Sequence, residues 1–323
     1  ICDIMEQMTP KIELYVTRTF SEKLSDTLGF VRENWRVLLK YFIYLMLPSA
    51  LVLGFFVNHF WGGYISLIGM DNDFDHRKLI DFILTTGGTV IVGMVVYAVF
   101  LAMIFALIRL YFARSLRLKG VTNEEFMPEF MACLKRSAIY LLVLVMLVGV
   151  FVVLLSFLMA GSFMLNPVVG IIGLLLFYAV LIAVIIPLSL SAPIYMMEDI
   201  GIFRAIAKAF RLGFATWGGV FALSFVIGML TGVIQSFTMV PWYILFIIKS
   251  IFMVSNDLEG SFVNTIGYTF LEYLACVLQC LGYLIAAILT IVALTIQYGH
   301  ASDKIDGVGV AKNIEHFDEF DNF

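Results

Sequence analysis

Six long apolar runs constrain this chain more than any other feature of its sequence. Each one reaches the roughly 20 residues that a helix needs to cross the hydrocarbon core of a bilayer. The runs are Val37–Val57, Phe82–Ile108, Ala138–Ser162, Val168–Met197, Gly218–Val240 and Leu271–Ile296. Hydrophobic residues make up 62% of the chain and charged residues 14%, against about 45–50% and about 25% in a soluble domain. The sequence therefore predicts an all-α, multi-pass membrane protein with six transmembrane helices.

A seventh apolar run, Pro241–Val254, is shorter than the others. At ~1.5 Å per residue it reaches about 21 Å, which is less than the ~30 Å thickness of the hydrocarbon core. The run also opens with a proline and contains Lys249. We expect it to form a re-entrant or interfacial segment and not a further span.

The distribution of lysine and arginine predicts the orientation of the six spans. With the N-terminus in the cytoplasm, only Arg77, Lys78 and Lys249 of the 20 Lys and Arg residues fall outside. This asymmetry agrees with the positive-inside rule and predicts that both termini lie in the cytoplasm, with the spans in the cytoplasmic (inner) membrane. Three regions result: a cytoplasmic N-terminal segment (1–36), a six-span membrane domain (37–298) and an acidic cytoplasmic tail (299–323).

Amphipathic segments precede the first, third and fifth spans. The first segment has an apolar face made of Phe20, Leu24, Leu28, Val31 and Trp35. The third has an apolar face made of Ile202, Ile206, Phe210 and Trp217. In the second, Phe126, Phe130 and Leu134 follow a capping box of Thr122 and Glu125. The pattern predicts a unit of one cytoplasmic surface helix and one transmembrane hairpin, repeated three times in parallel.

The apolar faces of the first and third segments are the candidate contact surfaces. Helices of this kind lie in the membrane plane with the apolar face down and tryptophans at headgroup depth. The same faces can instead pack on the protein's own loops or on a partner subunit. The candidate contact residues are Phe20, Leu24, Leu28, Trp35, Ile202, Ile206, Phe210 and Trp217.

Residue patterns for catalysis or metal binding are not found in the sequence. Cys276 and Cys280 are four residues apart, but no further Cys or His completes a metal site. The acidic run from Asp71 to His76 has neither the glycine nor the glutamate that a calcium loop requires. No nucleophile elbow or phosphate-binding loop occurs. We therefore predict no catalytic, cofactor-binding or metal-binding residues, and no cofactor.

Two features inside the spans leave alternatives open. Pro187 and Pro193 bracket the inner part of the fourth span, where they indicate either a kinked helix or a gating hinge. Lys249 and Glu272 either reach the outer interface separately or form an ion pair there.

The stretch from Glu198 to Trp217 resembles the inner-loop motif of bacterial six-span proteins similar to the glycerophosphodiester phosphodiesterase membrane domain. The shared features are an acidic residue, Gly201, and an Ala-rich basic helix that ends at Trp217 before the next span. The resemblance implies a stand-alone integral membrane protein, because the catalytic barrel of that family is a separate soluble domain. His76-Arg77-Lys78 does not match the His-Arg-Gly of that barrel, so no catalytic residue carries over.

A shorter stretch, Ala207-Lys208-Ala209 followed by Gly213, is similar to the coupling loop of ATP-driven importer permeases. It lacks the glutamate of that motif, and Lys208 replaces a small residue.

These observations favour a non-enzymatic membrane protein that acts as a scaffold, as a subunit of a complex or as an organiser of inner-leaflet lipid. The alternative is a permease for an apolar or lipid-like substrate, and an intramembrane enzyme is the third hypothesis. The expected partners are membrane lipids and other membrane or cytoplasmic protein subunits. No nucleic acid is expected, since the net charge is only -4.

Overall fold

A computed structural model describes residues 11–68, 76–254 and 262–311 of the chain. The long helices are α2 (Phe20–Ile68), α3 (His76–Ala113), α4 (Asn123–Leu165), α5 (Pro167–Leu188), α8 (Trp217–Val254) and α9 (Ile266–Asp306). The short ones are α6 (Ser191–Met197), α7 (Ile202–Ala215) and the 3-10 turn η1 (Phe262–Asn264). Among the described residues, six helical segments are long and apolar enough to cross a membrane, and no strand is present. The predicted all-α, multi-pass fold is confirmed.

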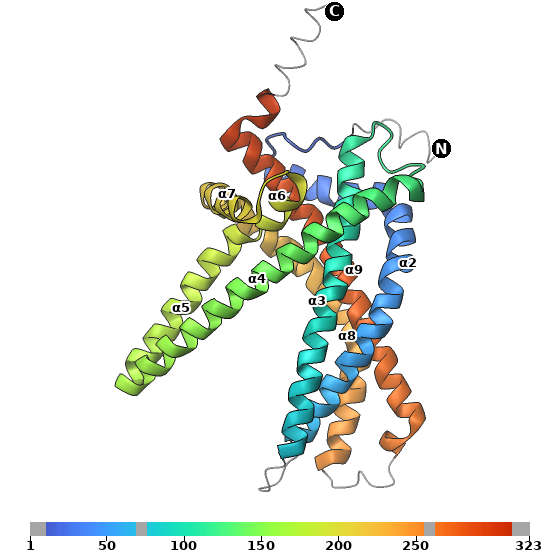
Figure 1. Cartoon of the computed structure of the whole chain (residues 1–323), viewed down its shortest axis with the longest axis vertical. Coiled ribbons are helices and arrows are strands. Elements are labelled where there is room, and N and C mark those ends of the chain that lie inside the picture. The colour runs from blue at the N-terminus through green and yellow to red at the C-terminus, as the bar shows by residue number, and fades with distance from the viewer. Residues whose placement is uncertain (1–10, 69–75, 255–261, 312–323) are drawn as a thin grey trace, which may run out of the picture.

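The long helices pair as three consecutive hairpins: α2 with α3, α4 with α5, and α8 with α9. Helices α2, α3, α8 and α9 run beside one another, whereas the α4–α5 hairpin diverges from them at an angle (Figure 1). The apolar stretches of α4 and α5 bury very little of their surface within the protein. Both faces of this hairpin are therefore available to lipid.

One end of the molecule, which we call the charged end, gathers the start of α2, the end of α9 and the short helices α6 and α7 (Figure 1). Residues 11–19 cross this end. Lys11 Nζ donates to the backbone oxygens of Phe112 and Arg114, at 3.1 and 2.9 Å, and the backbone N–H of Ile12 donates to the Tyr111 hydroxyl. The two Lys11 bonds use carbonyls at the end of α3 and just beyond it, which have no partners inside the helix.

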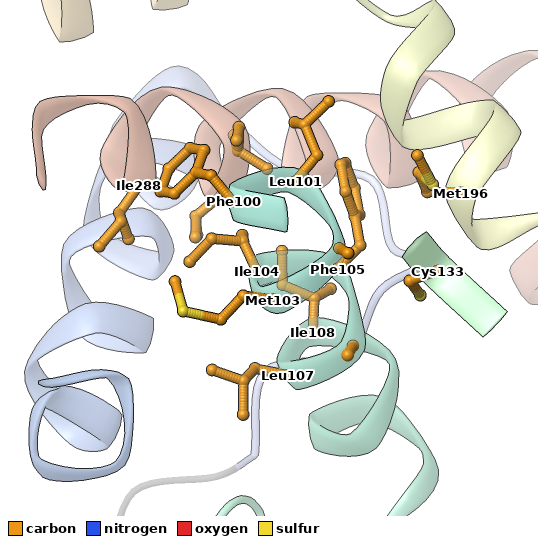
Figure 2. Close-up of a cluster of buried hydrophobic side chains, with 14 of the residues drawn as sticks. Phe100, Leu101, Met103, Ile104, Phe105, Leu107, Ile108, Cys133, Met196 and Ile288 are labelled. Carbon is orange, nitrogen blue, oxygen red and sulfur yellow. The ribbon is translucent and has the colours of Figure 1, made fainter. Parts of the chain in front are cut away.

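The core lies around the part of α3 nearest the charged end. Every residue from Phe100 to Ile108 is buried. Figure 2 shows this stretch surrounded by other helices, with Cys133 of α4, Met196 of α6 and Ile288 of α9 close to it. A helix segment that is apolar all round is covered either by lipid or by other elements, and here other helices cover it. This segment therefore anchors the helices that position the rest of the molecule.

Two of the three amphipathic segments differ from the prediction of separate surface helices. The first belongs to α2 and the second to α4, each continuous with the span that follows it. The capping box of Thr122 and Glu125 at the start of α4 is confirmed. Only the third segment is a helix of its own, α7, because Thr216 interrupts the chain before α8 begins at Trp217. No glycine or proline separates the first two segments from their spans, so the helix has no reason to stop.

The prediction that Pro241–Val254 forms a re-entrant or interfacial segment is wrong. These residues complete α8, which runs unbroken from Trp217 to Val254 with Pro241 inside it. A proline removes one intrahelical hydrogen bond, and neighbouring helices in a membrane compensate for that loss. The fifth span is thus longer than the sequence indicated.

The predicted acidic tail begins inside a helix. Helix α9 continues to Asp306, and Gly307 ends it with a φ of 64°, in the left-handed region that glycine adopts most easily. The predictions for Asp71–Asp75 and for the tail after Ala311 lie outside the described residues.

Candidate functional site

A cavity of about 640 Å³ lies where the α4–α5 hairpin diverges from the other long helices. Its walls come from α2, α3, α4, α8, α9 and the junction of α5 with α6. Most of the lining is apolar, with Val96, Leu101 and Phe105 from α3 and Leu284, Ile291 and Leu294 from α9. The cavity is thus a property of the helix arrangement and not of one local motif.

The cavity opens toward the surroundings of the protein. Two tyrosines of its wall, Tyr97 on α3 and Tyr283 on α9, expose 40% and 44% of their surface. Both lie within the apolar stretches of their helices. The opening therefore faces the level of the hydrocarbon core.

A few polar groups interrupt the apolar wall. The Gln279 side chain is buried and its Oε1 has no hydrogen-bond partner among the described residues. The hydroxyls of Tyr140 and Ser191 bond each other at 2.9 Å, and the Tyr283 hydroxyl contacts the Met239 sulfur at 3.6 Å. A buried amide oxygen without a partner favours a ligand that brings a donor. The wall therefore suits an apolar molecule with a polar group.

The candidate hinge prolines lie at a true break in the fourth span. Helix α5 ends at Leu188 and α6 begins at Ser191, so Pro187 and Pro193 stand on either side of the break. Pro193 lines the cavity. Pro187 is buried against α7, where a Cβ on Gly213 would lie only 2.5 Å from the Pro187 Cα. The fourth span is thus broken between α5 and α6, and the α5 side of the break packs closely against α7.

The apolar face predicted for the first segment mostly points away from the protein. Phe20, Leu28 and Trp35 are exposed, while Leu24 is half-buried beside a small cluster of α8 and α9 side chains. The opposite face of the same segment is buried, and it carries Lys23, Thr27, Phe30 and Asn34. The outward face is therefore free for lipid or a partner.

The apolar face predicted for α7 is only half exposed. The four residues Ile202, Ile206, Phe210 and Trp217 are partly buried, whereas Phe203 and Phe214 are exposed and were not among the candidates. Ala205, Ala209, Leu212 and Gly213 form the buried face. The small residues of this face let α7 approach α5 closely. The bulky apolar side chains of α7 therefore lie beside the contact and are only partly buried. Ala209 and Gly213, which carried the coupling-loop similarity, are thus covered by the protein itself.

A polar network that the sequence did not reveal joins four segments at the charged end. Glu198 accepts hydrogen bonds from the Tyr298 hydroxyl and from Lys208 Nζ, the latter at 2.6 Å. Tyr298 also bonds the Tyr15 hydroxyl at 3.0 Å. Burial raises the pKa of Tyr15 above its ordinary value. The network ties residues 11–19 and α9 to the start of α7.

Arg136 of α4 fixes the loop between α6 and α7. Its guanidinium donates to the backbone oxygens of Tyr195 and Glu198, bonds the Asp199 carboxylate at 3.1 Å and stacks over the Tyr195 ring at 4.5 Å. Long-range contacts of this kind have no signature in the local sequence.

At the opposite end of the bundle, the ion pair considered for Lys249 and Glu272 is formed. The Lys249 Nζ lies 2.9 and 2.8 Å from the two carboxylate oxygens. Trp61 and Trp242 lie beside the pair, and the Tyr268 hydroxyl donates to the Leu245 backbone oxygen. The pair links α8 to α9 near the end of α8 that follows Pro241.

No group of three or more His, Cys, Asp or Glu side chains in the described part of the chain is arranged to hold a metal ion. Cys276 and Cys280 are buried free thiols on α9.

Comparison of the chain with known protein families, curated proteins and solved structures found no match. The resemblance to the glycerophosphodiester phosphodiesterase membrane domain stays a prediction.

Proposed function

We propose that this membrane protein binds a lipid-like molecule in the cavity beside the α4–α5 hairpin and organises lipid without catalysing a reaction. The observation that carries the proposal is the apolar cavity of about 640 Å³. This volume falls in the range of about 300–1,000 Å³ that is typical of ligand pockets. An apolar wall that opens at the level of the hydrocarbon core favours a ligand that arrives from the bilayer.

The orientation we propose places the charged end in the cytoplasm. The excess of Lys and Arg on that side supports this assignment. Phe20, Leu28 and Trp35 would then lie at the inner headgroup layer, where exposed aromatic and apolar side chains are favourable. Partner subunits, if the protein is a scaffold, would contact the α4–α5 hairpin, whose apolar faces are exposed.

Filling the cavity tests the proposal. Ala287 lies in the wall, so Ala287→Trp places an indole where the ligand would sit. Ala179→Trp on α5 is the matched control, because Ala179 is exposed and does not line the cavity. We expect native mass spectrometry of the purified protein to show a co-purified lipid-like molecule in the wild type and in Ala179→Trp, with at least a tenfold lower occupancy in Ala287→Trp.

Equal occupancy in Ala287→Trp and Ala179→Trp would contradict binding in this cavity. A thermal unfolding curve for each variant shows that both are folded, so a loss of ligand cannot be confused with a loss of structure.

A permease for an apolar or lipid-like substrate is the second candidate. The break between α5 and α6 supports it, because Pro193 at that break lines the cavity. Transfer of a fluorescent lipid between the leaflets of protein-containing liposomes tests this function. We expect a permease to accelerate the transfer over protein-free liposomes and Ala287→Trp to remove the acceleration. If the protein binds lipid but does not accelerate lipid transfer between the leaflets, the permease hypothesis is excluded and the lipid-organising role is favoured.

A further inference from the structure

The inward face of the first part of α2 carries a lysine that the fold leaves unneutralised. Lys23 exposes 5% of its surface, at the charged end and away from the cavity. Among residues 11–68, 76–254 and 262–311, no carboxylate forms an ion pair with it. Asp26, which lies about one turn further along the same helix, is engaged by Arg18 at 2.6 Å. A buried cation of this kind is unfavourable unless an anion accompanies it.

A second unsatisfied side chain lies at the same place. Gln297 of α9 is fully buried, and neither atom of its amide has a hydrogen-bond partner in the described structure. A Cβ on Gly219 of α8 would lie 3.4 Å from the Gln297 Nε2 and 3.7 Å from the Lys23 Nζ. The ends of both side chains therefore converge on the space that the missing side chain of Gly219 leaves between α2, α8 and α9.

Further cations act on Lys23. They are Lys304 and Arg18, and Arg18 is itself paired with Asp26. His300 lies one turn beyond Gln297 on α9, and its Nδ1 accepts a hydrogen bond from the Arg18 backbone N–H at 2.9 Å. A neutral imidazole that accepts at Nδ1 carries its proton on Nε2 and is a donor there. The groups near Lys23 thus provide positive charge and hydrogen-bond donors.

We infer that Lys23, Gln297 and Gly219 form a binding site for a phosphate-bearing anion. An ammonium and an amide N–H are donors that suit phosphate oxygens, and the absence of a side chain at Gly219 leaves the ends of both uncovered on the α8 side. The outward face of the same helix segment carries Phe20, Leu28 and Trp35, which are exposed. If that face lies on the bilayer as proposed above, the niche is at headgroup depth, and the phosphate of an anionic lipid is within its reach. The site is separate from the cavity and holds whether or not the cavity binds a ligand.

The test measures thermal unfolding of the purified full chain in a zwitterionic detergent with three additions. The additions are phosphatidic acid, phosphatidylcholine and inorganic phosphate. We expect phosphatidic acid to raise the Tm of the wild type, because a ligand that binds only the folded state stabilises it. Lys23→Met should abolish this rise and weaken binding at least tenfold. Without any addition, Lys23→Met should be at least as stable as the wild type, since it removes an unpaired buried charge.

Two matched controls separate the site from general attraction of anionic lipid. Lys40→Met removes one exposed lysine from the same helix and should keep the rise in Tm. Gly219→Ala places a methyl group in the niche at ordinary contact distances and should lose the rise, whereas Gly218→Ala next to it meets no neighbouring atom and should keep it.

The comparison of additions identifies the source of the phosphate. A rise with phosphatidic acid but not with inorganic phosphate supports a lipid headgroup, and a rise with inorganic phosphate that Lys23→Met abolishes supports a free anion at the same site. The inference is overturned if wild type and Lys23→Met respond alike to both. If the phosphate site is absent, the co-purification of a lipid-like molecule with the cavity is unaffected. The two proposals can therefore be tested separately.

Discussion

At the scale of single residues, one ion pair joins two helices near the ends of their spans. Lys249 and Glu272 are 23 residues apart in sequence, but the packing of α8 on α9 brings them to 2.8 Å. Glu272 is buried, and Lys249 is partly buried. A carboxylate and an ammonium in such a place stabilise the fold only as a pair, because either alone is desolvated without compensation.

Removal of one partner of this pair should therefore destabilise the protein. We expect Glu272→Gln to lower the free energy of unfolding in detergent by about 3 kcal/mol, since Lys249 then lacks its counter-charge. The double variant Lys249→Met with Glu272→Leu should recover most of that loss. Equal stability of Glu272→Gln and wild type, measured by thermal unfolding, would mean that solvent screens the pair.

At the scale of elements, close approach of helices depends on glycine at the crossing points. Gly213 lets α7 lie against the end of α5, Gly282 lets α9 approach Thr238 of α8, and Gly54 lets α2 approach Val277 of α9. In each case a Cβ would lie 2.5 Å or less from the neighbouring helix. These contacts set where the helices cross, and so they shape the cavity between them.

Gly213→Ala should test the α7–α5 crossing. Its Cβ would meet the Pro187 Cα at 2.5 Å, and backbone atoms cannot move away as a flexible side chain can. We expect a loss of about 2 kcal/mol in unfolding free energy. The control is Gly228→Ala on α8, where a Cβ meets nothing within 4 Å and where alanine favours the helix. If both variants unfold at the wild-type temperature, the crossing is looser than described.

The outward face of the first part of α2 predicts the depth of Trp35. This side chain is 53% exposed, and Arg36 stacks on it at 5.6 Å. With Trp61, Trp217 and Trp242 replaced by phenylalanine, the emission of Trp35 in liposomes should be quenched by lipids brominated near the headgroup. Quenching by aqueous iodide alone would show that this segment stands clear of the bilayer.

At the scale of the whole molecule, the start of α2 and the end of α9 lie at the same end, as an even number of spans requires (Figure 1). The start of α3 at His76 lies at the opposite end. The distribution of Lys and Arg predicts which end faces the cytoplasm.

This topology is measurable by cysteine labelling. Cys133, Cys276 and Cys280 are buried, and Cys2 is replaced by serine in every variant, so the native cysteines should contribute little background. We expect a membrane-impermeant maleimide added to intact cells to label His76→Cys and not Arg204→Cys, with both labelled after the membrane is opened. Both positions are exposed in the fold. Labelling of Arg204→Cys in intact cells would show that the protein has the opposite orientation.

The sequence by itself determined the features that depend on neighbouring residues. Apolar length predicted the six spans, Thr122 and Glu125 predicted a helix start, and Pro187 with Pro193 indicated a kink or a hinge in the fourth span, where the structure has a break. Each of these properties is set within a few turns of one helix, where hydrophobicity and backbone chemistry act locally. The prediction that the fifth span ends before Pro241 was wrong. Helix α8 continues past this proline because neighbouring helices compensate for the hydrogen bond that it removes.

Only the tertiary structure decided which faces are buried and what lies between the helices. The walls of the cavity come from six segments that are distant in sequence. The niche of Lys23 likewise forms only where α2, α8 and α9 pack together. A helical periodicity shows that two faces differ, but it does not show which neighbour covers either of them. The first segment illustrates this, since its inward face is the one that carries Lys23 and Asn34 while Trp35 points outward. Burial is a property of contacts between residues that are distant in sequence, and the pattern of one segment cannot contain it.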